Sequence, residues 1–297
     1  MKKIISSIIF SLLFVHAIYA QTNIDLSGKW NFQIDRKDAG ISEQWFRNHL
    51  KEEINLPGSM PEKLKGDDVT VHTKWTGSLY DSSYYYNPFM EKYRIEGNIK
   101  LPFFLTPDKH YVGVAWYQKE VVIPSSWKGK RIVLSLERPH IETTVWVNDK
   151  KVGMQNSLCV PHVYDLSSYI HAGKCRITIR IDNRLKEINV GPDSHSVTDQ
   201  TQGNWNGIVG KISLTAGAPI HFDDIQVFPD VASKKALVKM IIKAENKSNT
   251  SAKVTLSAES FNSEKHHSPL PVSKDIVIKG DSVALEMELP MGDGMLT

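Results

Sequence analysis

The sequence has little excess charge of either sign and no dense cluster of basic residues. Its 297 residues carry 36 Lys and Arg against 33 Asp and Glu, a formal net charge of +3. Nucleic-acid binding depends on basic patches that neutralise phosphates, so this even scatter argues against a nucleic-acid partner. A hydrophobic content of 41% also argues against an intrinsically disordered chain. We therefore expect a folded protein that binds neither nucleic acid nor an acidic polymer.

Cysteine is scarce as well, and the two that are present, Cys159 and Cys175, are not spaced as metal ligands. The 11 histidines form no HExxH or similar pattern, so we expect no metal site and no cofactor. In an exported protein two cysteines can form one disulfide, and two unpaired, buried thiols are the equally weighted alternative. The sequence leaves both alternatives open.

Long apolar runs are confined to the N-terminus. Lys2 and Lys3 precede an apolar stretch over residues 4–15, and the small residue Ala20 follows at an expected cleavage point. This pattern is typical of a secretory signal peptide. A membrane-spanning helix needs about 20 apolar residues, and no later segment is long enough, so we expect no membrane anchor. Residues 1–20 are therefore predicted to be a cleaved signal peptide of a secreted or periplasmic protein.

Helical periodicity is nearly absent from the rest of the chain. Only residues 42–50 have apolar side chains at helical spacing, with Ser42 as the expected N-cap. In such a helix Trp45, Phe46 and Leu50 would face inward. We therefore predict one short helix in this segment.

Strand patterns dominate elsewhere. Residues 175–182 alternate apolar and polar side chains, which predicts a strand buried on one face only. Residues 143–147 and 151–153 flank an Asn-Asp-Lys tripeptide, whose residue types tolerate tight turns, so a β-hairpin is expected there. The pattern as a whole predicts an all-β fold.

The composition changes at residues 215–219, a small-residue and proline junction. We place a domain boundary there, so that residues 21–217 form a large β-sandwich and residues 218–297 a smaller one. The smaller unit is expected to be an antiparallel sandwich of immunoglobulin type. Its predicted strands cover residues 225–228, 237–242, 254–258, 276–278 and 283–289.

Aromatic residues are concentrated in a long segment, residues 58–111, that has little clean alternation. Exposed aromatic rings can stack on the apolar face of a sugar ring. The alternative is that most of these rings pack together and give the loop its own core, and we favour it because clustered aromatics are usually buried. The aromatic side chains concerned belong to Trp75, Tyr80, Tyr84, Tyr85, Tyr86, Phe89, Tyr93, Phe103 and Phe104.

Seven short motifs follow one another along the first part of the chain. They are LSGKWNF (26–32), LPG (56–58), WYQKEV (116–121), VWVNDKKVG (145–153), YDLSSYI (164–170), IDN (181–183) and NWNGI (204–208). Together and in this order they resemble the N-terminal sugar-binding domain of glycoside hydrolase family 2, which includes β-galactosidases, β-glucuronidases and β-mannosidases. The resemblance covers roughly residues 24–214.

The resemblance implies a jelly-roll sandwich, an immunoglobulin-like sandwich and then a TIM barrel that carries two catalytic glutamates. A TIM barrel typically takes about 250 residues, far more than follow Ala218. The Asn-Glu dipeptide of the family's acid/base residue is also absent from this sequence. We therefore expect a chain truncated before the catalytic barrel.

No other carboxylate pair is expected to replace the missing glutamates. Retaining glycoside hydrolysis needs two carboxylates about 5 Å apart across the scissile bond. Adjacent acidic residues in strands or turns are more often solvated, so we interpret the three pairs here as surface charge. We predict no catalytic residue and an inactive chain when it stands alone. The pairs are Glu52-Glu53, Asp67-Asp68 and Asp223-Asp224.

The polar, amide-rich loop over residues 194–207 is the candidate binding site. The resemblance implies a loop here that supplies an Asp or Asn to the hydroxyls of a terminal sugar. The matching residues are Asp199, Asn204 and Asn206, and Trp205 is placed to cover a ring face. The alternative is that these polar side chains hydrogen-bond to the backbone and stabilise the loop itself. Both interpretations stay open at this stage.

The leading hypothesis is the non-catalytic N-terminal portion of a secreted family 2 glycosidase, which supports the barrel and helps to bind the terminal sugar. One alternative is a freestanding carbohydrate-binding protein without hydrolytic activity. Another is a structural module that assembles with a separately encoded barrel. In each case the expected partner is a carbohydrate or the catalytic barrel.

Overall fold

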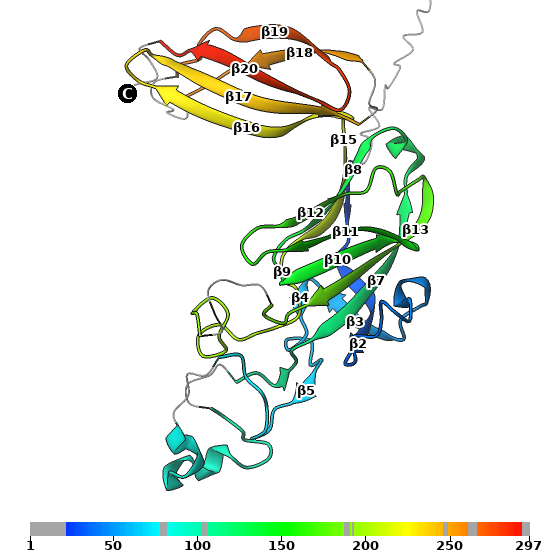
Figure 1. The fold of residues 1–297 in the computed structure, drawn as a ribbon, viewed down its shortest axis with the longest axis vertical. Helices are drawn as coiled ribbons and strands as arrows, with labels where there is room; N and C mark the ends of the chain where they lie inside the picture. Colours follow the sequence, from blue (N-terminus) through cyan, green and yellow to red (C-terminus); the bar gives the residue numbers. More distant parts are fainter. Residues whose placement is uncertain are drawn as a thin grey trace, which may run out of the picture.

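The structure is a computed structural model that describes residues 22–77, 82–101, 106–186, 191, 193–245, 249–260 and 266–292. The predicted signal peptide therefore lies outside the described residues. Strands make up nearly all of the regular structure, as the sequence predicted (Figure 1). They enclose two separate hydrophobic clusters, one built from residues 26–216 and the other from residues 238–287.

The first cluster lies in a jelly-roll sandwich of two antiparallel sheets. One sheet has the order β11 (Lys150–Asn156), β10 (Glu142–Val147), β13 (Gly173–Asp182), β7 (Val114–Ile123), β2 (Gly28–Asp35) and β3 (Glu52–Leu56). The other has the order β1 (Asn23–Asp25), β15 (Ile212–Gly217), β8 (Arg131–Leu136) and β12 (His162–Asp165). The inward-facing residues of both sheets form the core, as expected when sheets pack face to face.

Smaller elements lie at the ends of the sandwich. A three-stranded ribbon joins β4 (Gly58–Ser59), β14 (Gly207–Ile208) and β9 (Pro139–His140), and β5 (Asp67–Asp68) pairs with β6 (Lys109–His110). The 3-10 turns are η1 (Trp45–Arg47), η2 (Ser82–Tyr85), η3 (Pro88–Tyr93) and η4 (Ser125–Trp127).

The predicted hairpin is confirmed, because β10 and β11 pair antiparallel around the Asn-Asp-Lys turn. The strand predicted at 175–182 is also present, within β13, but it is buried on both faces instead of one. Its polar residues Arg180 and Asp182 are buried because the segment after β2 covers the outer face of the sheet. Alternation correctly predicted the strand but not its surroundings.

The helix predicted over residues 42–50 is wrong. Only the single 3-10 turn η1 forms, and the residue before it, Gln44, has a left-handed backbone conformation that interrupts any longer helix. The hydroxyl of Ser42 donates to the carbonyl of Ala39 and caps nothing. Short isolated helices are marginal, so tertiary packing decides this segment. The inward direction of its apolar side chains was predicted correctly, since they pack on the buried rings of Trp116 and Trp146.

The aromatic-rich segment packs partly on itself, as the favoured alternative predicted. Tyr84 and Leu101 are buried, with Trp75, Met90 and Tyr93 against them. Three rings at the outer end remain exposed, those of Tyr85, Tyr86 and Phe89. Tyr80, Phe103 and Phe104 lie outside the described residues.

The second cluster lies in an immunoglobulin-like sandwich formed by a three-stranded and a two-stranded sheet. All five strands predicted after residue 218 are present. The larger sheet has the order β16 (Ile220–Asp230), β17 (Lys235–Ala244) and β20 (Ser282–Pro290). The smaller sheet pairs β18 (Thr250–Leu256) with β19 (Val272–Ile278).

Both cysteines are free, so the disulfide interpretation is wrong. The alternative of two buried thiols holds for Cys175, which lies in β13, but not for Cys159, which is exposed. No helix among the described residues is long and apolar enough to cross a membrane.

Candidate functional site

The candidate loop, residues 194–207, ends at Gly207, the first residue of β14. Three of its predicted polar residues, Asp199, Asn204 and Asn206, are buried, and Trp205 is half-buried. The loop is fixed by hydrogen bonds to segments far away in the sequence. The structure therefore brings the four predicted residues into one region, in different environments.

Asp199 joins the loop to the start of the aromatic-rich segment. Its Oδ2 accepts a hydrogen bond of 2.6 Å from the backbone N–H of Thr76, and its own N–H donates to the Thr76 carbonyl at 3.0 Å. Its Oδ1 accepts from the backbone N–H of Asn204. The Nε2 of His110, also buried, lies 3.5 Å from Oδ2. Asp199 thus joins the two loops through hydrogen bonds to the main chain of Thr76.

Asn204 is fixed by a second asparagine, Asn183, which directly follows β13. The side-chain N–H groups of Asn204 donate to the Asn183 carbonyl at 3.0 Å and to the Thr76 hydroxyl at 3.1 Å. Its Oδ1 accepts from Asn183 Nδ2 at 2.9 Å. Asn183 also spans the gap to Tyr111 and Gly113. Every polar group of the Asn204 side chain therefore has a partner inside the protein.

Asn206 is anchored deepest. Its Nδ2 donates to the carbonyls of Gly113 and Ile181, each at 3.1 Å, and its Oδ1 accepts from the hydroxyl of Tyr117 at 2.8 Å. Tyr117 itself is completely buried in the main core, and burial raises the pKa of its hydroxyl well above the ordinary value. The hydroxyl thus remains a donor. Through these three hydrogen bonds Asn206 fixes the main chain directly after Trp205.

Trp205 stacks on an imidazole ring. The ring centroids of Trp205 and His140 are 4.6 Å apart, with 24° between the planes. Burial lowers the pKa of His140 to about 4, although the side chain of Asn204 and the charge of Asp199 favour the protonated form. His140 is therefore neutral near pH 7. A neutral ring supports one face of Trp205, whose side chain keeps part of its surface in solvent.

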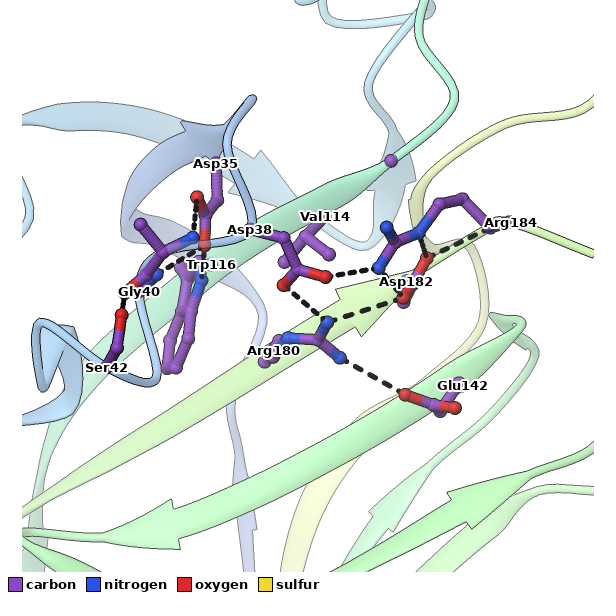
Figure 2. A network of polar contacts seen from close by, with 12 residues as sticks. Asp35, Asp38, Gly40, Ser42, Val114, Trp116, Glu142, Arg180, Asp182 and Arg184 are labelled. Atoms are coloured by element: carbon purple, nitrogen blue, oxygen red, sulfur yellow. Dashed lines mark hydrogen bonds and ion pairs between the residues drawn. The ribbon is translucent and has the colours of Figure 1, made fainter. Parts of the chain in front are cut away.

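A buried charge network lies at the end of β13 (Figure 2). The carboxylate of Asp182 has no exposed surface and lies 3.3 Å from Arg180, 2.6 Å from Arg184 and 2.7 Å from Lys186. Burial alone raises the pKa of Asp182, but hydrogen bonds from Arg184 and Lys186 outweigh it and hold that pKa well below its usual range. The carboxylate thus stays ionised.

Two further carboxylates complete this network. Asp38 accepts from Arg180 at 2.8 Å and also contacts Arg184 at 2.5 Å, and Glu142 accepts from Arg180 at 3.1 Å. Figure 2 shows these side chains converging from the segment after β2, from β10 and from the end of β13. The network therefore fixes the segment just after β13 to the outer face of the sheet.

The adjacent acidic pairs are surface charges, as predicted. Each carboxylate of the first two pairs is exposed and meets a cation: Glu52 meets Lys65, Glu53 meets Lys29, Asp67 meets Arg36 and Asp68 meets Lys109. Asp223 pairs with Lys243 at the surface of the second sandwich. Within the described residues there is no group of three or more His, Cys, Asp or Glu side chains arranged to hold a metal ion.

Sequence reasoning missed several residues that contact this loop. Thr76, His110 and His140 gave no signal, because each meets the loop from a distant segment. Asn183 stands in one of the seven motifs, but nothing in the pattern pairs it with Asn204.

Comparisons with known proteins identify the first sandwich. The model of the family described as "Glycosyl hydrolases family 2, sugar binding domain" matches residues 24–217. The β-glucuronidase of Homo sapiens is 25% identical over 239 residues, which cover 72% of this chain and 32% of that protein. The β-galactosidase of Priestia megaterium is 24% identical over 214 residues, or 71% of this chain and 18% of its own length. The chain thus spans about a third of the curated β-glucuronidase.

Solved structures share the fold. A β-glucuronidase from glycoside hydrolase family 2 superposes with a TM-score of 0.61 at 15% identity, over 92% of this chain and 27% of that one. Bacteroides uniformis β-glucuronidase 2 gives a TM-score of 0.58 at 17% identity, over 90% of this chain and 27% of that one. At these identities the likeness shows the fold and no more.

Proposed function

The chain belongs to glycosyl hydrolase family 2, and we propose that it is the non-catalytic N-terminal portion of a secreted glycosidase that helps to bind the terminal sugar of a β-glycoside. The observation that carries this proposal is the half-buried Trp205, stacked on the neutral ring of His140. Tryptophan faces bind the apolar side of sugar rings, and a rigid support lowers the entropy lost on binding.

We assign different roles to the four residues of the loop. Trp205 makes the sugar contact, because it is the member of the set that keeps solvent-exposed surface. Asp199, Asn204 and Asn206 hold it in position, since their polar groups are already bonded to the protein. Such a rigid supporting shell is what a precise binding site requires.

Catalysis belongs to a TIM barrel that the matched region does not include. The chain spans about a third of its curated β-glucuronidase relatives, so the remainder of such a protein has ample room for a barrel. In this proposal the first sandwich supports the barrel and presents Trp205 beside its opening. The isolated chain then hydrolyses no glycoside, because the two carboxylates that retaining hydrolysis needs are supplied elsewhere.

A β-glucuronide is the first ligand to test, since the curated relatives include several β-glucuronidases. Calorimetric titration of the purified chain with p-nitrophenyl β-D-glucuronide, and with the matching β-galactoside, should detect weak binding without release of p-nitrophenol. Trp205→Ala should weaken binding at least about tenfold, or about 1.4 kcal/mol. Phe228→Ala, which removes an exposed ring from the second sandwich, is the matched control and should leave binding unchanged.

Two results would overturn the proposal. Equal affinities for the wild type and Trp205→Ala would remove Trp205 from the site, and absence of binding to every glycoside offered would remove the site itself. Tight binding of a glycan by the isolated chain would favour the alternative of a freestanding carbohydrate-binding protein.

We also propose export of the protein by its N-terminal segment, residues 1–20. The support is the sequence pattern of two lysines followed by an apolar run. Mass spectrometry of the protein recovered outside the cytoplasm should find a mature N-terminus near Gln21. Recovery of the intact N-terminus from the cytoplasm alone would refute it.

A further inference from the structure

Two hollows lie next to each other in the aromatic-rich segment. One has a volume of about 590 Å³ and the other of about 700 Å³, both in the range of small-molecule sites. Their lining residues fall within residues 68–71, 90–101 and 106–108, a different part of the chain from the candidate loop. In Figure 1 the cyan coils of this segment lie at the end of the molecule opposite the second sandwich. We name the two together the paired hollows, because four residues line both: Gly97, Ile99, Pro107 and Asp108.

The inside of the paired hollows is largely apolar. Leu101 is 8% exposed, and the other apolar side chains there are half-buried. An apolar lining with a few polar groups is typical of small-molecule sites, and it can cover the apolar C–H face of a sugar ring. The half-buried apolar residues are Met90, Tyr93, Ile99 and Pro107.

Two unpaired carboxylates border the paired hollows. Glu96 and Asp108 are exposed, and within the part of the chain that the structure describes neither makes a hydrogen bond or an ion pair. In contrast, Asp68 pairs with Lys109, and Arg94 donates to two main-chain carbonyls. An ionised carboxylate is an acceptor with two oxygens, so each can accept hydrogen bonds from neighbouring hydroxyl groups. Glu96 and Asp108 are therefore available to a ligand that carries hydroxyls.

The charge of the paired hollows favours a neutral ligand. Three carboxylates, those of Asp68, Glu96 and Asp108, stand against the two cations of Arg94 and Lys100. Like charges repel, so a sugar acid is disfavoured relative to a neutral sugar. A purely apolar ligand would gain nothing from the two free carboxylates.

Hydrogen bonds hold the walls of the paired hollows in place. The side chain of Asn98 donates to the carbonyl of Lys92 at 2.6 Å, and the backbone N–H of Lys100 donates to the carbonyl of Tyr93 at 3.1 Å. The hydroxyl of Tyr84 donates to the same carbonyl of Tyr93 at 2.7 Å. A site that is already ordered loses less entropy when a ligand binds.

The paired hollows begin close to the candidate loop. β5 and β6 place Asp68 beside Lys109, and His110 follows Lys109 in the same strand. The Nε2 atom of His110 lies 3.5 Å from the Oδ2 atom of Asp199. Asp108 is two residues from His110, and two residues of extended chain span at most about 7 Å. The paired hollows and the candidate loop therefore meet neighbouring parts of β6.

We propose that the paired hollows form a second sugar subsite, which binds a neutral sugar unit of a glycan longer than one residue. The proposal rests on the proposed sugar-binding function and adds the class of ligand, an oligosaccharide. Hydroxyl groups of the sugar donate to Glu96 and Asp108, and its apolar face lies on Ile99 and Pro107. A one-sugar glycoside uses Trp205 alone, so a ligand long enough to reach both sites should bind more tightly.

Calorimetric titration of the purified chain with ligands of increasing length tests the subsite. The neutral ligands are methyl β-glycosides and β-linked galacto-, gluco- and manno-oligosaccharides of up to six sugars, and the acidic ligand is a hyaluronan hexasaccharide. Asp108→Ala removes a carboxylate that borders both hollows, and Ile99→Ala removes apolar surface that both share. Glu91→Ala is the matched control, because it removes an exposed carboxylate of the same segment that lines neither hollow.

In at least one neutral series the affinity should rise at least about tenfold from one sugar to six. Asp108→Ala and Ile99→Ala should abolish this gain and leave the affinity for one sugar unchanged, whereas Glu91→Ala should behave like the wild type. An affinity independent of length in every neutral series, or a gain that survives both substitutions, would overturn the proposal. A hyaluronan hexasaccharide bound as tightly as the best neutral hexasaccharide would overturn the choice of a neutral sugar.

Hydrogen exchange of the unsubstituted chain guards against a variant that misfolds. Saturation with the neutral hexasaccharide that binds most tightly should slow exchange within residues 96–101 and 106–109. Protection confined to other residues would contradict the subsite.

Trp205→Ala separates this proposal from the contact proposed at Trp205. The variant should lose affinity for one sugar and keep the gain with length. Unchanged one-sugar affinity in Trp205→Ala, together with loss of the gain in Asp108→Ala, would refute the Trp205 contact and support the paired hollows. The converse pair of results would refute the paired hollows alone.

Discussion

The Nη2 atom of Arg184 lies 2.6 Å from the Oδ2 atom of Asp182, two residues earlier in the chain. Between them stands Asn183, whose side chain turns inward to Asn204. The ion pair thus fixes the backbone at the end of β13 (Figure 2). Asn183, which lies between these two ion-pair residues, therefore connects the charge network to the candidate loop through its hydrogen bonds with Asn204.

Removing the charge of Asp182 should destabilise the first sandwich. In Asp182→Asn, the buried Arg180 loses one of its three carboxylate partners. Breaking a buried ion pair from one side typically costs about 3 kcal/mol, because a charge stays behind without full compensation. Urea unfolding should show this loss. Lys29→Gln, which breaks the exposed pair with Glu53, should cost less than about 1 kcal/mol. Equal effects of the two variants would contradict the importance of the network.

The stability of the protein should fall as the pH is lowered from about 6.5 to about 4, in part through His140. Burial lowers the pKa of folded His140 to about 4, whereas an unfolded histidine titrates near 6.5. Between these values the unfolded chain binds more protons, so protonation favours unfolding. His140→Phe keeps a ring against Trp205 but does not titrate, and its stability should fall less steeply over this range.

The measurement is the free energy of unfolding in urea at several pH values between 4 and 7. His171→Gln, at an exposed position, is the control and should follow the wild-type slope. Parallel curves for the wild type and His140→Phe would show that His140 does not contribute.

Local pattern predicted the strands of this protein but not which of their faces are covered. The alternation in β13 correctly indicated a strand. Burial of Arg180 depends on Asp38 and Glu142, which lie 142 and 38 residues away in the sequence. No periodicity within β13 contains that information. The same limit explains the wrong helix at residues 42–50, where packing on Trp116 and Trp146 set the conformation.

The sequence singled out residues of the candidate loop, but it did not predict which distant residues they contact. The motif around residues 204–208 drew attention to this loop, and the structure brings its predicted residues into one region. That Asp199 bonds to Thr76, 123 residues away, and that Trp205 stacks on His140, follow from tertiary contacts alone. The polar residue types were equally consistent with binding a sugar and with binding the backbone.

A side chain at Gly207 should disrupt the three-stranded ribbon of β4, β14 and β9, in which the candidate loop ends. Gly207 has a φ of +137°, and a Cβ there would lie 2.5 Å from the carbonyl oxygen of Gly58 and 3.0 Å from the Cα of Ser59. Both contacts are backbone atoms of the paired strand β4 and have little room to move. Gly207→Ala should therefore lower the free energy of unfolding by about 3 kcal/mol or more.

Gly203 provides the matched comparison in the same loop. Its φ is +69°, and the nearest atom to a Cβ would be Asp199 Oδ1 at 4.0 Å. Gly203→Ala should cost only the left-handed backbone penalty of about 1 kcal/mol. Chemical unfolding of both variants checks the difference, and a Gly207→Ala protein as stable as Gly203→Ala would contradict the close approach of β14 to β4.

The two cysteines should react at very different rates in the folded protein. Cys159 is exposed, whereas Cys175 is buried in β13, where desolvation raises the pKa of its thiol to about 11. Since the thiolate is the reactive form, Cys175 should be inert at pH 8 on both grounds. Ellman's reagent should detect one thiol per molecule in the native state and two in guanidinium chloride. Cys159→Ser should abolish the native signal, and Cys175→Ser should preserve it. Detection of no thiol even in the denatured, unreduced protein would mean that a disulfide forms, in contradiction to the two free cysteines of the structure.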